Sequence, residues 1–184
     1  MALKIEQNPA LTFPADVLDT YDRSKTWYVA QTKSRREKAL ANFLAKRDVG
    51  YFLPLYGKRQ PSSRRARYSL VPLFPGYLFF KGTEAQRLEA YTSNHIARLI
   101  DVEDQDTLVR ELGLTRDLLS LDAPVYPFEL VREGQRVRIT HGPMRGIEGV
   151  ISSKKKNYRL VLNVTSIAQA VAVDVAADMV EASA

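Results

Sequence analysis

Cysteine is absent from this sequence of 184 residues, and histidine occurs only twice. The lack of cysteine excludes disulfides, thiolate metal sites and cysteine nucleophiles. His95 and His141 stand 46 residues apart, so no histidine-based metal or catalytic cluster is expected. No apolar run approaches the roughly 18 residues of a membrane span, and residues 1–24 lack the basic start and apolar block of a secretion signal. These absences predict a cytoplasmic protein without membrane attachment, metal, cofactor or enzymatic activity.

Acidic residues are scarce between Lys33 and Arg67, where eleven basic residues face two acidic ones, a net charge of +9 in a chain of +6. Such a field attracts a polyanion such as nucleic acid, or an acidic protein surface; a solvated basic face is the alternative. The part from Gly57 to Leu70 has no acid at all and is typical of a protruding hairpin or loop. Its candidate phosphate contacts are Lys58, Arg59, Arg64, Arg65 and Arg67.

The stretch Val71–Phe80 combines two prolines and a glycine with four aromatic residues. Pro72 and Pro75 fix φ and donate no hydrogen bond, and Gly76 can take a positive φ, which predicts a rigid bend before a strand over 78–81. Composition alone favours burial of these aromatic rings, because aromatic residues dominate protein cores. A rigid bend can also present them outward.

Hydrophobic periodicity divides the rest of the chain into an α+β region and a β region. Residues 1–24 show no sustained period and read as an irregular extension. Residues 25–122 predict an antiparallel sheet packed with helices, in the order β-α-β-hairpin-β-α-β-α. Strands are expected over 26–32, 51–56, 78–81 and 96–102, and helices from a capping box at Ser34 and Glu37 to Gly50, over 84–91 and over 104–121.

The second region follows a predicted linker over 123–133, which contains two prolines and no regular period. Residues 134–184 alternate with period two and predict a small β-barrel of about five short strands. Its lysine run, Lys154–Lys156, is typical of a solvated turn, with nucleic-acid contact as the alternative.

Four segments stand out, each occurring once and in a fixed order along the chain. They are Trp27-Tyr28-Val29, the helical Glu37, Phe74–Phe79, and Gly134–Ile139 continued by Gly142–Val150. Together these segments resemble NusG-type transcription factors, over about residues 25 to 182. No single motif is specific, but the ordered set at this spacing is. The resemblance implies an N-terminal NusG domain over 25–122 and an SH3-like KOW β-barrel over 134–184.

The resemblance also implies the partners of the chain. Family members remain bound to bacterial RNA polymerase during elongation and dock on the clamp helices of its largest subunit. The residues of this chain that match the docking positions are Trp27, Phe74 and Tyr77. This reverses the expectation from composition, so Phe74 and Tyr77 are expected to face outward, with Phe79 or Phe80 holding the sheet to its helices. The basic hairpin lies where members approach upstream DNA or the non-template strand. A monomer is expected.

Two further loops match positions that contact partners in the family. Ser93-Asn94-His95 precedes the fourth strand, near where relatives can touch the opposite side of the polymerase cleft. A plain turn or packing role is favoured for His95 over such contact, and the absence of the glycine usual in that loop counts further against contact. In the KOW region, Met144 and Ile167 stand at positions associated with binding a ribosomal protein or a termination factor. Met144 and the turn Ile167-Ala168-Gln169-Ala170 depart from the housekeeping pattern, which has an aromatic residue and an Ile-Phe-Gly-Arg-like turn there. With the basic hairpin and the amino-terminal extension, these departures favour a specialised RfaH-like antitermination paralogue.

Two alternatives remain open from the sequence. A ribosome- or structured-RNA-binding KOW protein would use the second region as its main site and leave Phe74 and Tyr77 buried. Some specialised relatives fold the KOW region as a helical hairpin, but the alternation at Val137/Ile139 and Leu160/Leu162 predicts strands here.

Overall fold

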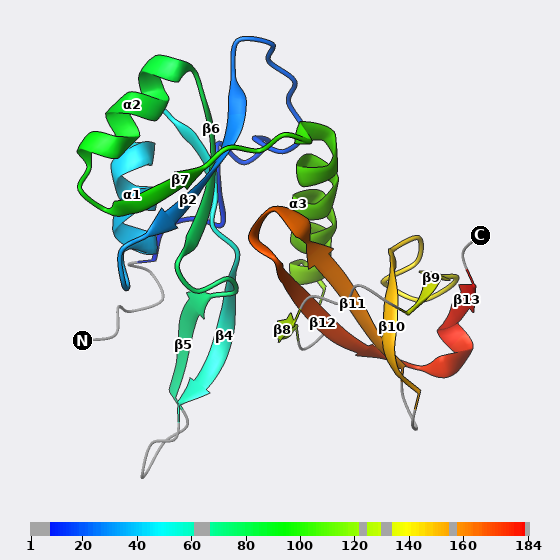
Figure 1. Cartoon of the computed structure of the whole chain (residues 1–184). Helices are drawn as coiled ribbons and strands as arrows, with labels where there is room; N and C mark the ends of the chain where they lie inside the picture. Colours follow the sequence, from blue (N-terminus) through cyan, green and yellow to red (C-terminus); the bar gives the residue numbers. More distant parts are fainter. Residues whose placement is uncertain (1–7, 61–66, 122–124, 130–133, 155–157, 183–184) are drawn as a thin grey trace. The chain divides into compact units, whose positions relative to one another are not determined.

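The computed structural model describes residues 8–60, 67–121, 125–129, 134–154 and 158–182. The chain forms two compact units, Met1–Gln105 and Asp106–Ala184, here called the N-terminal and C-terminal units (Figure 1). The sequence places the end of the first domain near residue 122, and that boundary remains a prediction. No helix in the described part of the chain is both long and apolar enough to cross a membrane.

The N-terminal unit is built on a five-stranded antiparallel sheet of order β1-β3-β6-β2-β7. Its strands are β1 (Thr12–Phe13), β2 (Thr26–Thr32), β3 (Gly50–Phe52), β6 (Tyr77–Gly82) and β7 (Ile96–Ile100). Directly paired residues share one face of a sheet. The pairs Tyr28–Phe80 and Ala30–Leu78 therefore define a helix face, which packs with residues of α1 (Glu37–Ala45) and α2 (Glu84–Thr92). The predicted α+β fold of this region is confirmed.

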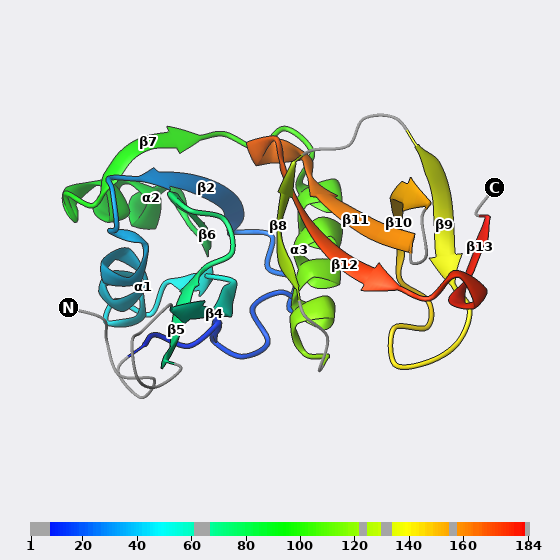
Figure 2. The ribbon, with the colours of Figure 1, turned by 90° about the horizontal axis from the view of Figure 1, so that it is seen from below.

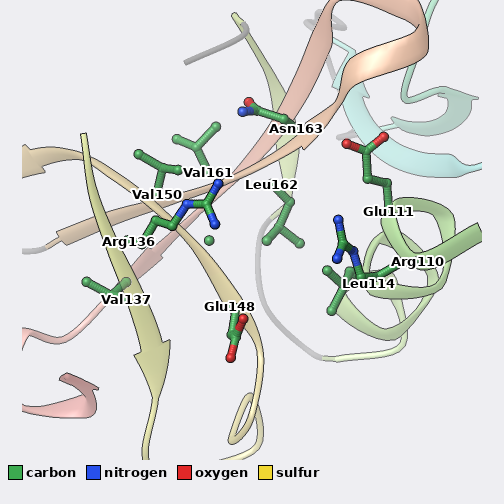
Figure 3. Close-up of a pocket in the computed structure, with 11 residues that line it drawn as sticks. Arg110, Glu111, Leu114, Arg136, Val137, Glu148, Val150, Val161, Leu162 and Asn163 are labelled. Atoms are coloured by element: carbon green, nitrogen blue, oxygen red, sulfur yellow. The ribbon is translucent and has the colours of Figure 1, made fainter. Parts of the chain in front are cut away.

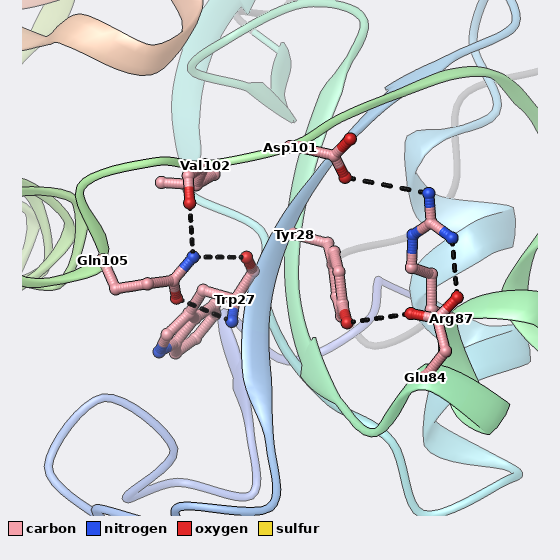
Figure 4. Close-up of polar contacts among 7 residues, drawn as sticks. All are labelled: Trp27, Tyr28, Glu84, Arg87, Asp101, Val102 and Gln105. Carbon is pink, nitrogen blue, oxygen red and sulfur yellow. Dashed lines mark hydrogen bonds and ion pairs between the residues drawn. The ribbon is translucent and has the colours of Figure 1, made fainter.

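Helix α2 is fixed at its start by local and long-range polar contacts. Thr83 and Gln86 form a reciprocal capping box at its N-terminus. The hydroxyl of Tyr28 on β2 donates to Glu84 at 3.4 Å, and Arg87 pairs with Glu84 at 2.8 Å (Figure 4). Burial, and next the Glu84 carboxylate, raise the pKa of the Tyr28 hydroxyl. These contacts tie α2 to the strand beneath it.

The predicted capping box at Ser34 is wrong, because α1 starts two residues later than it would require. Arg36 occupies the N-cap position without a side-chain hydrogen bond, and the Glu37 carboxylate is engaged elsewhere. The helix also ends at Ala45, before Gly50, which instead begins β3. A left-handed residue, Asp48 at φ 55°, turns the chain between them.

The amino-terminal extension is more ordered than its composition predicts. Residues Thr12–Phe13 form the edge strand β1 against β3, and Val17 and Leu18 are buried. A Cβ at Gly50 would meet the Val17 side chain at 2.7 Å, so the extension packs closely over this end of the sheet. Sequence periodicity missed β1 because two residues are too short to show alternation.

The predicted basic hairpin is confirmed. Strands β4 (Leu55–Gln60) and β5 (Arg67–Pro72) pair with each other alone and extend away from the five-stranded sheet (Figure 1). Pro54 separates β4 from β3, as its missing N–H predicts. The tip, 61–66, lies outside the described residues.

The C-terminal unit is a six-stranded antiparallel sheet, preceded by α3 (Gln105–Leu119), whose first residue belongs to the N-terminal unit (Figure 2). The strand order is β13-β9-β10-β11-β12-β8. The strands are β8 (Tyr126–Glu129), β9 (Gln135–Ile139), β10 (Glu148–Lys154), β11 (Tyr158–Val164), β12 (Gln169–Val175) and β13 (Val180–Ala182), with short 3-10 turns η2 (Thr165–Ile167) and η3 (Ala177–Met179). The prediction of strands instead of a helical hairpin is confirmed.

One part of the predicted linker is wrong. Tyr126–Glu129 form β8, which pairs with β12 at the end of the sheet order, Pro127 lying opposite Val171. A proline fits an edge strand because only one side of that strand is paired, so two prolines nearby did not exclude a strand here.

Candidate partner-binding surfaces

The Phe74–Tyr77 bend is held to both neighbouring elements by its glycine. Gly76 takes φ +85°, a left-handed conformation that favours glycine. Its N–H donates to the carboxylate of Glu37 on α1 at 2.7 Å, and its carbonyl accepts from the N–H of Thr32 at the end of β2 at 2.7 Å. Within the bend, the Tyr77 N–H donates to the Phe74 carbonyl at 3.1 Å. The predicted rigid bend is therefore present and anchored.

The sheet face opposite α1 and α2 is lined by aromatic and aliphatic side chains. Strand pairing places Trp27 beside Lys81, Val29 beside Phe79, and Gln31 beside Tyr77, all on this face. Phe52 of β3 lies opposite Phe79, with ring centroids 6.3 Å apart. We call Trp27, Val29, Phe52, Tyr77 and Phe79 the aromatic face.

Trp27 is fixed on this face by a glutamine from the start of α3. The Trp27 N–H donates to Gln105 Oε1 at 2.9 Å, and Gln105 Nε2 donates to the carbonyls of Trp27 and Val102, each at 3.0 Å (Figure 4). One amide thus satisfies both backbone groups of Trp27 at a sheet position. Trp27 itself is 3% exposed.

The structure brings the three predicted polymerase-binding residues to the same side of the sheet but does not expose them all. Phe74 is only 1% exposed, because its ring packs edge-on against Phe79 at 6.0 Å. The prediction that Phe74 faces outward is therefore wrong. Tyr77 is partly exposed. Phe80, as expected, packs on the helix face.

The basic hairpin is secured at its base by a lysine. Lys38 of α1 donates to the Leu70 carbonyl of β5 at 2.6 Å, and burial lowers the pKa of its ammonium. Lys58 is exposed, and the backbone positions of Arg59 and Arg67 lie in the paired part of the hairpin. Arg64 and Arg65 lie outside the described residues. Of the predicted phosphate contacts, Lys58, Arg59 and Arg67 therefore share one projecting element.

The Ser93–His95 turn is built without glycine. Asn94 adopts the left-handed conformation at φ 58° that a glycine would otherwise supply. Lys33 holds the turn from the other side: its ammonium donates to Asn94 Oδ1, and its backbone N–H donates to the His95 carbonyl at 2.8 Å. The His95 ring meets Phe43 edge-on, and burial, then Arg36 and Lys33, lower its pKa. His95 thus has the packing role that the sequence favours.

In the C-terminal unit, the two predicted partner-contact residues are both buried. Met144 lies in the turn after β9, and Ile167 ends η2. Their side chains offer little surface, so contact with a partner through them remains a prediction. Lys155 and Lys156 of the lysine run lie outside the described residues.

A cavity of about 250 Å³ lies between α3 and the strands of the C-terminal unit (Figure 3). Arg110 and Glu111 approach from the helix, and Arg136 and Glu148 from the strands. Glu111 also accepts from the N–H and hydroxyl of Thr165, at 2.9 and 2.6 Å. The charges of opposite sign balance, so the cavity carries no net preference for an anion or a cation. No group of acidic or histidine side chains in the described residues could hold a metal ion.

The aromatic face and the basic hairpin both lie within a stretch of the chain that matches a known protein family. A family model described as "Transcription termination factor nusG" matches residues 25–115. This stretch is a NusG domain. The chain is therefore a transcription factor of NusG type. The match starts just before β2 and leaves out the amino-terminal extension.

Two solved structures resemble the chain. "Domain interaction in Thermotoga maritima NusG" matches 86% of this chain and 97% of that chain, at 20% identity and a TM-score of 0.50. "Crystal Structure of MjSpt4:Spt5 complex conformation B" matches 85% of this chain and 96% of that chain, at 16% identity and a TM-score of 0.28. The first supports a NusG-like fold. No curated protein matches the sequence.

Two residues that matter for these surfaces were missed or misread from the sequence. The sequence pattern indicates a capping role for Glu37 and no particular role for Gln105. Their partners, Gly76 and Trp27, lie 39 and 78 residues away along the chain, and no local pattern indicates contacts at such separations.

Proposed function

We propose that this chain is a transcription elongation factor that binds RNA polymerase through the aromatic face and suppresses pausing or termination. The observation that carries the proposal is the aromatic face itself. Both helices of the N-terminal unit pack on the opposite face, and this one carries aromatic side chains with few rotors to freeze, which suits the anchors of a protein interface. Of the aromatic face, only Tyr77 is partly exposed. Docking therefore requires Phe74 and the other members of the face to become accessible, namely Trp27, Val29, Phe52 and Phe79.

We propose that the basic hairpin forms a second binding element, which binds nucleic acid. Its exposed Lys58 and the arginines beside it suit the phosphate backbone of upstream DNA or of the non-template strand. Binding of this kind is salt-sensitive and largely independent of base sequence. We assign the protein to the operon-specific, RfaH-like class, because Met144 and the turn Ile167-Ala168-Gln169-Ala170 depart from the housekeeping pattern of the KOW region. A ribosomal protein or a termination factor is the partner class for that region.

Capture of RNA polymerase by the tagged full chain tests the docking site. Phe74→Ala would remove a buried ring and endanger the fold, so Tyr77→Ala is the better variant. We expect it to reduce polymerase capture by about tenfold, the effect of removing an interface anchor. Tyr91→Ala on α2 is the control, since Tyr91 is 50% exposed and lies away from this face. Equal capture by folded Tyr77→Ala and the unmodified chain would refute docking here.

Readthrough in a purified transcription system tests the effect on elongation. The protein should increase readthrough of pauses or terminators on its native leader, because a ligand that binds only the closed form of polymerase shifts the enzyme toward that form. No change in pausing or termination on any native leader would contradict the proposal.

A ribosome- or structured-RNA-binding KOW protein is the second candidate function. The burial of Phe74 favours it, because this reading leaves that residue in the core. Co-purification separates the two functions: polymerase subunits support the first, and ribosomal RNA supports the second.

A further inference from the structure

A hollow in the N-terminal unit lies where the amino-terminal extension meets the sheet. Its volume is about 650 Å³, within the roughly 300–1,000 Å³ typical of ligand pockets. The extension contributes Tyr21, Asp22 and Arg23, and the sheet side contributes Asp48 and Lys81. The NusG match begins at residue 25, so the residues that the extension contributes lie outside the matched stretch, whereas Asp48 and Lys81 lie inside it.

Lys81 is the charged group at the base of this pocket. It is only 7% exposed, and burial lowers the pKa of its ammonium. The ammonium donates to the carbonyl of Thr20 and lies 6.0 Å from the centre of the Trp27 ring. An ammonium has three N–H donors, and among the described residues it has this one hydrogen-bond acceptor. A buried cation with spare donors favours an anionic ligand.

The rim of the pocket adds a flat aromatic ring and more positive charge. Tyr21 is 85% exposed, the most exposed large apolar side chain described, and Arg23 and Lys25 stand nearby on the same segment. Three carboxylates oppose an anion. Asp22 and Asp16 both attract the Lys81 ammonium, Asp22 is also engaged by Ser24 and Lys25, and Asp48 is exposed. The pocket therefore carries no excess of positive charge, and an anion is favoured only at the buried Lys81 ammonium.

We propose that this pocket binds a nucleotide unit, with its phosphate at Lys81 and its base stacked on Tyr21. Aromatic rings accept any base by stacking, and lysine and arginine bind phosphate oxygens. The nucleotide unit is either a free nucleotide or part of a nucleic-acid strand, because both present the same phosphate and base. The site is separate from the hairpin, but it borders the aromatic face, because the Lys81 ammonium also lies beside the Trp27 ring.

Fluorescence anisotropy with the full chain, without metal ions, tests the site. The two probes are a labelled ATP and a labelled single-stranded DNA of about 12 nucleotides. We expect Tyr21→Ala to weaken binding by about tenfold and Tyr21→Phe to retain it, since stacking needs only the ring. Lys81→Met should weaken binding as well. Asp48→Asn should strengthen it about twofold, because it removes a like charge from the pocket.

The control variant is Tyr91→Ala, which removes an exposed ring outside the pocket. Loss of ATP binding in Tyr21→Ala assigns the pocket to a free nucleotide. A loss confined to the DNA probe assigns it to a strand. If neither probe binds, or if Tyr21→Ala and Asp48→Asn bind both probes like the unmodified chain, the proposal is overturned. Since Tyr21→Ala and Asp48→Asn alter exposed residues, misfolding cannot account for that result.

Discussion

Single side chains decide the backbone geometry around the aromatic face. Glu37 accepts the Gly76 N–H at the bend, and Gln105 bonds both backbone groups of Trp27. The hydrogen bond to the charged Glu37 carboxylate contributes about 1.5–3 kcal/mol to stability, and each hydrogen bond of the neutral Gln105 amide contributes less. These contacts therefore fix where the aromatic side chains stand, although neither residue belongs to the face.

The bend depends on the left-handed conformation of Gly76. We expect Gly76→Ala to destabilise the N-terminal unit by about 1–2 kcal/mol, because a Cβ is strained at this positive φ. Gly57→Ala is the matched control: it lies in β4 with open space around a Cβ, so it should be neutral or stabilise by up to about 1 kcal/mol. Urea unfolding followed by Trp27 fluorescence measures both. Equal stability of the two variants would contradict the role of Gly76.

His95 should titrate below the ordinary histidine value of 6.5, because burial and then its cationic neighbours lower its pKa. A lowered pKa favours the neutral ring in the fold, so stability is greatest above pH 6.5 and falls as pH drops through the folded value. Lys33→Gln should raise the NMR titration midpoint part of the way, since burial remains. A midpoint at or above 6.5 in the unmodified chain would refute this packing role. The His141→Gln variant assigns the two ring signals.

At the scale of elements, the hairpin shows what composition can predict. The run without acids between apolar strands predicted a projecting β4–β5 pair, because a strongly basic segment is poorly suited to a core. The anchor at its base could not be predicted. Lys38 looks like one more solvated cation of α1, yet it bonds the Leu70 carbonyl, a contact made only once the helix and the hairpin have folded.

The hairpin should bind DNA through charge alone. We expect Lys58→Ala combined with Arg59→Ala to lower affinity for unrelated DNA sequences to a similar extent. The slope of log affinity against log salt should fall by about one for each phosphate that the variant no longer neutralises. Lys46→Ala, which removes an exposed cation outside both the hairpin and the Lys81 pocket, serves as a control. Weaker binding restricted to one DNA sequence would contradict backbone binding.

Strand β8 shows where local pattern fails. Four residues with a proline at the second position show no convincing alternation, so the segment is typical of a linker. Its structure comes from tertiary context: Tyr126 and Phe128 pack beside Val161, Ala170 and Ala172. The Tyr126 hydroxyl also donates to Asp174 at 2.9 Å. The longer strands β9 to β12 were predictable, because alternation over five to seven residues carries enough signal.

At the scale of the whole molecule, each unit has a core of its own. Leu44 is fully buried in the N-terminal unit, and Leu160 is fully buried in the C-terminal unit. The fold class of both units followed from periodicity and from the family resemblance. Side-chain exposure on the aromatic face did not follow: Phe74 is buried by Phe79, and a sequence gives no sign of which aromatic of a cluster will lie beneath.

Substitutions in the two cores should act on different signals. Leu44→Ala should destabilise the N-terminal unit by about 2–5 kcal/mol and shift the fluorescence transition of Trp27, the single tryptophan. Leu160→Ala should instead raise amide hydrogen exchange in β9 to β12 and leave the Trp27 transition in place. If both variants shift both signals equally, the chain unfolds as one cooperative body.

The two-residue strand β1 has a consequence for how this protein can be shortened. β1 covers the outer edge of β3, whose unpaired N–H and carbonyl groups would otherwise be available to another chain. A protein trimmed to the family boundary at residue 25 would lose that cover and the buried Val17 as well. Such a fragment should self-associate edge to edge, and a chain that keeps residues 8–24 should not.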